Sequence, residues 1–160
     1  KESDFDIVMT NPPFGSVLGK EAFDSLGKFT MLTGKSSLPL EIAGLERSIQ
    51  LLGEKGRMAI VLPDSVLLNK NLGYVRDWLS SNTKLKAIIS LPPETFSPFG
   101  ANVKTSVVIL VKEKIESPYD IFMASVENIG YDASGRRSKT DSDLNNVAAE
   151  FANFIKKEGW

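Results

Sequence analysis

The segment Thr10-Asn11-Pro12-Pro13-Phe14 joins a side-chain amide, two prolines and an aromatic ring directly after a hydrophobic run. The first proline fixes its own φ and pushes Asn11 toward an extended conformation, and the second stiffens the turn further. Such a corner can present the Asn11 side-chain oxygen and a backbone carbonyl side by side, and both accept hydrogen bonds. Phe14 can stack on a planar ring. The corner therefore suits a ring that carries an exocyclic amino group, although Pro-Pro also ends ordinary strands.

The composition narrows the chemistry that the chain can perform. It has 160 residues, 42% of them hydrophobic, a net charge of −1, and neither Cys nor His. This length and hydrophobic content suffice for one domain with a core. The absence of Cys and His excludes disulfides, thiol nucleophiles, His-based acid–base catalysis and the common zinc sites. A near-zero charge means that any contact with nucleic acid must be local or supplied by a partner.

The hydrophobic pattern predicts the elements that position the corner. Continuous apolar runs predict strands, and apolar residues at helical spacing predict amphipathic helices. The expected strands cover residues 5–10, 57–62, 84–91, 105–112 and 119–126. The expected helices cover residues 39–52, 72–81 and 141–157. Residues 15–37 read as a loop with a short helical turn, and residues 132–142 as an exposed polar loop.

The order of these elements predicts an α/β fold. Strands alternate with helices through two crossovers, which implies parallel βαβ units, and two strands then follow without a helix. An open sheet, mostly parallel with an antiparallel element near its C-terminal end, fits this order. In such sheets ligands bind beyond the carboxyl ends of the strands, where Asn11, Asp64 and Pro92 are expected to lie.

Five segments resemble the modification subunit of type I restriction–modification systems, an adenine-N6 DNA methyltransferase family. They are residues 5–15, 56–64, 88–96, 103–108 and 129–131, in the family's order and at plausible spacing. The Asn-Pro-Pro-Phe tetrapeptide is shared with other amino-group methyltransferases. The string Leu-Pro-Pro-x-x-Phe followed by Val-Lys-Thr-Ser is more particular. The resemblance implies part of a Rossmann-like class I methyltransferase sheet.

The resemblance also implies roles for individual residues. The side-chain oxygen of Asn11 and the carbonyl of Pro12 would accept hydrogen bonds from the N6 amino group of a flipped adenine, and Phe14 would stack on the base. These three would be catalytic. The expected substrate-binding residues are Pro13, Phe96 and Lys104. Asn11 would also adjoin the cofactor, S-adenosylmethionine, and no metal is expected.

Several of these residues have plain structural alternatives. Phe96 could be a core residue at a strand end, and Lys104 a surface residue at the start of a strand. Asp64 either lines the pocket or caps a helix, and the cap is the favoured interpretation. The pair Arg136-Arg137 either contacts DNA or is solvated in its polar loop. Two Gly-Lys segments, within residues 15–20 and 34–36, lack the spacing of an NTP-binding loop.

One part of the family's pattern is not found. The glycine-rich cofactor loop and the acidic residue that holds the ribose precede the Asn-Pro-Pro-Phe strand in the family, and no comparable strand–turn–helix occurs here. We therefore expect residues 1–130 to form the C-terminal half of a catalytic domain, and residues 131–160 to form a loop and helix packed on it. The first strand's edge and an apolar face should be exposed. Binding of S-adenosylmethionine by this chain alone should be weak or absent.

The sequence thus predicts a fragment of a cytoplasmic, site-specific DNA methyltransferase that modifies adenine N6 in double-stranded DNA. The expected partners are the missing N-terminal half, a specificity subunit and a restriction subunit, with no membrane. One alternative is an enzyme with the same corner that methylates RNA or a protein glutamine. Another is a non-catalytic, methyltransferase-like module whose exposed sheet edge serves as an interface.

Overall fold

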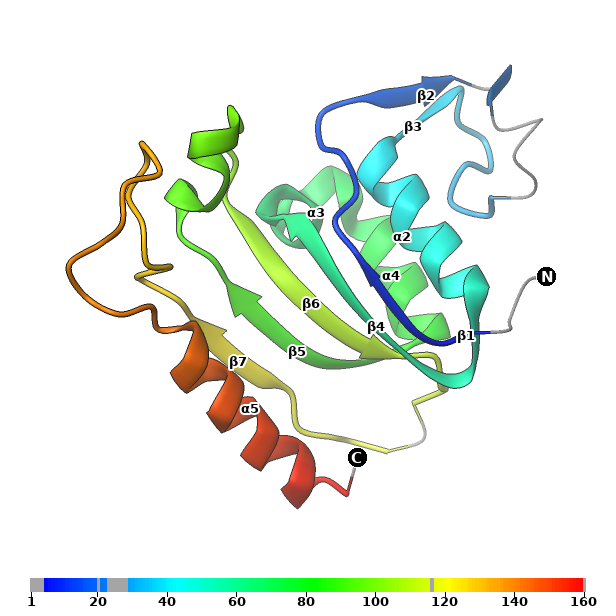
Figure 1. Cartoon of the computed structure of the whole chain (residues 1–160). Coiled ribbons are helices and arrows are strands. Elements are labelled where there is room, and N and C mark those ends of the chain that lie inside the picture. The colour runs from blue at the N-terminus through cyan, green and yellow to red at the C-terminus, as the bar shows by residue number, and fades with distance from the viewer. Residues whose placement is uncertain (1–4, 20, 23–28, 116, 160) are drawn as a thin grey trace.

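The computed structural model describes residues 5–19, 21–22, 29–115 and 117–159. A five-stranded sheet runs through the molecule, with helices on both of its faces (Figure 1). The strand order is β1-β4-β6-β5-β7. The bounds of these strands are β1 Phe5–Thr10, β4 Leu52–Pro63, β5 Lys84–Ser90, β6 Thr105–Val111 and β7 Phe122–Ser125.

The strand directions determine which strands end at the same edge of the sheet. β1 is parallel to β4, and β5 is parallel to β7, whereas β6 is antiparallel to both β4 and β5. All strands except β6 therefore run in the same direction, so β1, β4 and β5 end at the same edge of the sheet. This confirms the expected α/β fold with an antiparallel element late in the chain.

Two helices cover one face of the sheet and form the main core. α2 (Leu40–Leu51) and α4 (Gly73–Asn82) correspond to the first two expected helices, and α3 (Asp64–Leu68) with η1 (Lys70–Leu72) connects β4 to α4. Apolar residues of α2 recur at helical spacing and are buried against alternate residues of β4. The fully buried members of this contact include Ile42, Leu45, Ile60 and Leu62.

The two edges of the sheet are covered differently. On the β7 side, α5 (Leu144–Lys157) packs its Phe151 and Phe154 rings against Phe122, at centroid distances of 5.4 and 5.7 Å. On the β1 side, no described strand lies beyond β1. Phe5, Ile7 and Met9 of β1 are 51%, 62% and 79% exposed. The expected exposure of the first strand is confirmed.

Some local expectations were wrong. The segment after the corner contains an antiparallel pair, β2 (Val17–Gly19) and β3 (Ser37–Pro39), where a loop with a short helical turn was expected. Residue 20 and residues 23–28 lie outside the described residues. β4 begins at Leu52 because an irregular turn between Leu52 and Arg57 stays paired with β1. β7 is shorter than predicted, and η2 (Pro93–Phe99) separates β5 from β6.

Candidate active site

The corner after β1 is held against the start of α2. Pro12 is buried, and a Cβ placed on Gly44 would lie only 3.0 Å from the Pro12 Cβ, so α2 approaches the corner at a position where a side chain would crowd it. The carbonyl of Ser16 accepts a hydrogen bond of 2.9 Å from the Leu40 amide. These contacts fix both sides of the corner to one helix.

The Asn11 side chain is available for a ligand. It is exposed and makes no hydrogen bond to another described residue. Glu41 lies in the first turn of α2, three residues before Gly44, and is 9% exposed. Its Oε2 atom is buried without a hydrogen-bond partner among the described residues. The sequence analysis missed Glu41, whose only signal is an acidic residue at an inward-facing helical position.

A second aromatic residue reaches the corner from the end of β5. The chain leaves β5 through Leu91 and Pro92, and the Thr95 hydroxyl donates a 2.7 Å hydrogen bond to the Pro92 carbonyl at the start of η2. This turn places the Phe96 ring 5.9 Å from the Phe14 ring, at an interplanar angle of 83°. Because the rings are nearly perpendicular, a planar ligand can stack on one and meet the edge of the other.

Asp64 does not cap a helix. It is the first residue of α3, which has no side-chain cap, and its carboxylate instead accepts a 2.8 Å hydrogen bond from the Ser106 hydroxyl of β6. Lys104 Nζ lies 3.8 Å from the other carboxylate oxygen of Asp64. The cap interpretation was therefore wrong, and Asn69 is the residue whose side chain accepts from a backbone amide, that of Asn71. The lysine charge is partly balanced by Asp64.

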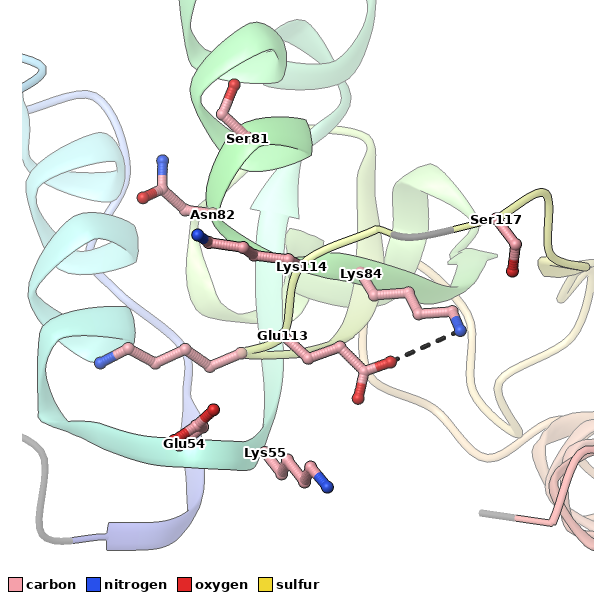
Figure 2. A pocket seen from close by; sticks show the side chains of 9 residues that line it. Glu54, Lys55, Ser81, Asn82, Lys84, Glu113, Lys114 and Ser117 are labelled. Carbon is pink, nitrogen blue, oxygen red and sulfur yellow. Dashed lines mark ion pairs between the residues drawn. The ribbon is translucent and has the colours of Figure 1, made fainter.

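A pocket lies at the opposite end of the sheet, where β5 begins and β6 ends. It has a volume of about 650 Å³ and is lined mainly by charged side chains (Figure 2). Lys84 pairs with Glu113 at 3.4 Å, and Lys112 donates to the Leu52 carbonyl at 2.6 Å. The full lining is Glu54, Lys55, Ser81, Asn82, Lys84, Lys112, Glu113, Lys114 and Ser117. It contains no aromatic residue, so the candidate site is the corner after β1.

Neither a metal-binding cluster nor a membrane-spanning helix is found in the described ranges. No group of three or more potential metal ligands occurs there. No helix in that part of the chain is long and apolar enough to span a membrane.

Comparison with known proteins identifies the family. The N-6 DNA methylase family model matches residues 1–160. The methylase subunit of the type I restriction enzyme EcoEI from Escherichia coli is 30% identical over a segment that covers 67% of this chain and 21% of that protein. The EcoKI methylase subunit from Escherichia coli K12 is 33% identical, over 70% of this chain and 20% of that protein.

Solved structures show the same fold. The crystal structure of the EcoKI M protein superposes with a TM-score of 0.62 at 24% identity, covering 83% of this chain and 28% of that chain. A Listeria monocytogenes protein described as a class I S-adenosylmethionine-dependent methyltransferase gives a TM-score of 0.70 at 18% identity, over 96% of this chain and 43% of that one. The chain spans about a fifth of the length of the curated relatives it matches. On its sequence and its fold, this chain belongs to the N-6 DNA methylase family, with type I modification subunits among its relatives.

Proposed function

We propose that this chain forms the target-base part of a type I modification methyltransferase that transfers a methyl group to N6 of a flipped adenine in double-stranded DNA. The observation that carries the proposal is the contact between Phe14 and Phe96 beside an Asn11 amide that no described residue engages. A flipped base would stack on Phe14 and meet the edge of Phe96. Pro13 is exposed at the rim and would contact the base or its sugar.

The chain's own contribution to the reaction is the position of the amino group. Asn11 Oδ1 and the Pro12 carbonyl would accept the two N6 hydrogens, which draws the nitrogen lone pair out of conjugation with the ring and orients it. A chain without His suits this mechanism, because fixed acceptors and correct placement lower the barrier without a strong base. Lys104 would reach a DNA phosphate in competition with Asp64.

The described residues fit only one side of a cofactor site. They contain no glycine-rich strand–turn–helix, and Asn11 is the residue that would adjoin S-adenosylmethionine, which supplies the methyl group when bound. We propose that a further segment holds most of the cofactor and covers β1. The exposure of Phe5, Ile7 and Met9 supports this, as does the short share of each relative that this chain matches.

The remaining partners follow from the relatives. EcoEI and EcoKI are named as methylase subunits of type I restriction enzymes. We propose that this protein likewise acts with a specificity subunit, and that a restriction subunit joins the assembly. Residues 1–130 would supply the catalytic surface, and residues 131–160 would pack on it.

The test is Asn11→Ala in a complete methyltransferase that contains this chain. Methylation of DNA should fall at least about 100-fold, comparable to the loss of one oxyanion-hole donor elsewhere. Binding of S-adenosylmethionine should be largely unchanged, which separates a lost acceptor from a misfolded protein. Asn145→Ala, an exposed amide on α5, is the matched control. Retained methylation in Asn11→Ala would refute the assignment.

Two alternatives have separate tests. Offering DNA, RNA and a glutamine-containing protein as substrates distinguishes the proposed enzyme from one with the same corner and another substrate. The exposed β1 residues favour a second candidate, a non-catalytic interaction module, for this chain in isolation. Calorimetry on the isolated chain should detect weak or no binding of S-adenosylmethionine. A micromolar dissociation constant would contradict the view that the cofactor site is mostly elsewhere.

A further inference from the structure

The tip of η2 holds an aromatic side chain out in solvent. Phe99, three residues after Phe96, is 78% exposed. The tip itself is well braced: Gly100 takes a left-handed conformation with φ 85°, and its amide donates to the Ser97 carbonyl at 3.0 Å. The next amide, that of Ala101, donates to the Phe96 carbonyl at 3.1 Å. The exposed ring is therefore carried by an ordered turn beside the corner.

A hairpin, residues 131–137, is closed by an antiparallel bridge between Tyr131 and Arg137 and packs against this tip. The Tyr131 hydroxyl donates a 2.8 Å hydrogen bond to the Thr95 carbonyl, inside η2. At the hairpin's turn, a Cβ placed on Gly135 would lie 3.3 Å from the Pro98 Cβ, and Gly135 also has a φ of 79°, so the turn packs closely on Pro98. Figure 1 shows this loop, between β7 and α5, alongside η2.

Two arginines follow the glycine that packs on Pro98, the residue before Phe99. Arg136 and Arg137 directly follow Gly135, and both are exposed. Asp132 is the acidic residue nearest to them in the hairpin, and its Oδ1 atom already accepts hydrogen bonds from the Ser134 amide, the Ser134 hydroxyl and the Arg136 amide. Arg137 forms no ion pair with another described residue.

We propose that Pro98, Phe99, Arg136 and Arg137 form a DNA-contacting surface, and that Phe99 enters the duplex beside the flipped adenine. This rests on the function proposed above and extends it to residues outside the corner. Flipping a base breaks its pairing and stacking, and apolar wedges that insert at base steps support such distortions. The arginines would hold the adjacent phosphates.

The position of an exposed ring near two arginines distinguishes this DNA-contacting surface from ordinary surface residues. Single exposed apolar side chains are common and need no function. Here the ring follows the proposed base-binding Phe96 on the same short helical segment, and Gly135, which packs on that segment, directly precedes the two arginines. An exposed apolar group with cationic neighbours complements a polyanion whose bases stack. DNA is the partner that matches both features.

The wedge is tested with Phe99→Ala in the complete methyltransferase, on a normal duplex and on one whose target adenine is mismatched. The variant should lose about 10-fold or more in kcat/KM on the paired substrate, because a base–aromatic contact is typically worth that much. The mismatch should restore most of the loss, because its adenine is already unpaired. The fluorescence of 2-aminopurine at the target position should also rise less than in the wild type. Met123→Ala, 72% exposed on β7, is the control.

The phosphate contacts are tested with the double variant Arg136→Ala/Arg137→Ala. Its DNA affinity should fall to a similar degree on all sequences, and the slope of log affinity against log salt should decrease by up to about 2. The double variant Lys156→Ala/Lys157→Ala at the end of α5 removes the same charge elsewhere and should change the slope less.

The outcomes separate this inference from the proposed function. Equal losses on paired and mismatched DNA, or no loss in Phe99→Ala, would overturn the wedge. An unchanged salt slope would overturn the phosphate contacts. Either result leaves the proposed function standing if Asn11→Ala still abolishes methylation. Methylation retained in Asn11→Ala would overturn the function itself.

Discussion

The two ends of the sheet offer opposite kinds of surface. The carboxyl end has an amide, prolines and aromatic rings, and the centroids of the Phe14 and Phe96 rings lie 5.9 Å apart there. The amino end of β5 has a pocket of about 650 Å³ with four lysines and two glutamates among its lining residues. Figure 2 shows that the side chains of Lys55 and Lys114, which line this pocket, extend in different directions. A pocket lined mainly by charged groups is therefore a poor match for a planar, neutral base.

The two ends also differ in how their residues are held in place. At the carboxyl end, one helix clamps both sides of the corner, through Gly44 on Pro12 and Leu40 on Ser16. At the other end, Lys84 pairs with Glu113, and their side chains are 21% and 34% exposed. Ion pairs that remain accessible to solvent contribute little to stability. The corner combines an amide, prolines and two aromatic rings on a braced turn, whereas the pocket is lined mainly by charged side chains.

The largest effect after that of Asn11→Ala is expected for Phe14→Ala. Removing the ring deletes the stacking surface but leaves the acceptors in place, so kcat/KM should fall about 10- to 100-fold, since base–aromatic stacking is worth about 1–3 kcal/mol. Steady-state kinetics on duplex DNA would measure this. Phe14→Tyr keeps the ring face and should retain most activity. Similar losses in the two variants would show that Phe14 acts through packing.

A glycine at each end gives the next test. In Gly44→Ala the new Cβ would press on Pro12 from 3.0 Å, so the corner should shift by a few tenths of an ångström. We expect kcat to fall about 10-fold with little change in stability, because small misplacements of reacting groups are costly.

Gly56→Ala is the matched change at the opposite end. Its Cβ would lie 2.9 Å from the Gly53 carbonyl oxygen and 3.0 Å from that of Phe5, and backbone atoms cannot move aside as a side chain can. The free energy of unfolding should fall by about 1–3 kcal/mol, the usual cost of overpacking. Denaturant unfolding and kcat, measured on both variants, should separate them. A stability loss in Gly44→Ala equal to that in Gly56→Ala would remove the distinction.

The sequence predicted the frame of the molecule because periodicity is a local signal. A stretch of about a dozen residues is enough to recognise each of these patterns. The apolar runs predict β1, β5 and β6, and the helical spacing predicts α2 and α5. The corner could be found because Asn-Pro-Pro-Phe is contiguous. Its second ring, Phe96, was reached through the family resemblance, since nothing local in the chain pairs it with Phe14.

The failures all involve contacts between distant residues. Asp64 reads as a helix cap until Ser106 of β6, antiparallel to β4, places a hydroxyl 2.8 Å from its carboxylate. The short pair β2 and β3 has too few residues to show an alternating pattern. For Arg136 and Arg137 the sequence leaves DNA contact and solvation both open, and it does not show their position near η2, because the Gly135 contact with Pro98 joins segments that are far apart in the sequence.

A smaller effect concerns the hairpin at the carboxyl end. The pKa of Asp132 lies below its ordinary value of 3.8, chiefly because the Ser134 hydroxyl donates to the carboxylate, and then because the Arg136 amide does. Because the pKa of Asp132 is lower in the folded protein than in the unfolded chain, the ionised carboxylate stabilises the hairpin at any pH above the unfolded-state pKa. This stabilisation is lost as the pH falls through the lower, folded-state pKa. The amide resonances of Ser134 and Arg136 should therefore shift below pH 3.8, and Asp132→Asn should remove that titration. A midpoint at or above 3.8 would contradict the hydrogen-bonded arrangement.

The smallest effect on activity is expected at the lysine-lined pocket. In Lys55→Gly/Lys114→Ala, methylation and DNA affinity should stay within about twofold of wild type, because changes at exposed charges usually have small effects. Neither lysine forms an ion pair with another described residue. Lys55 has a φ of 61°, a left-handed conformation that glycine adopts more easily.

That backbone feature makes the result informative in both directions. Strained positions persist where a structure holds them, and they are frequent at functional sites. If the Lys55 conformation serves no ligand, glycine should raise the free energy of unfolding by up to about 1 kcal/mol while activity is unchanged. A stabilised protein with reduced methylation or DNA affinity would mean that the pocket takes part in function, and the contrast between the two ends of the sheet would then be wrong.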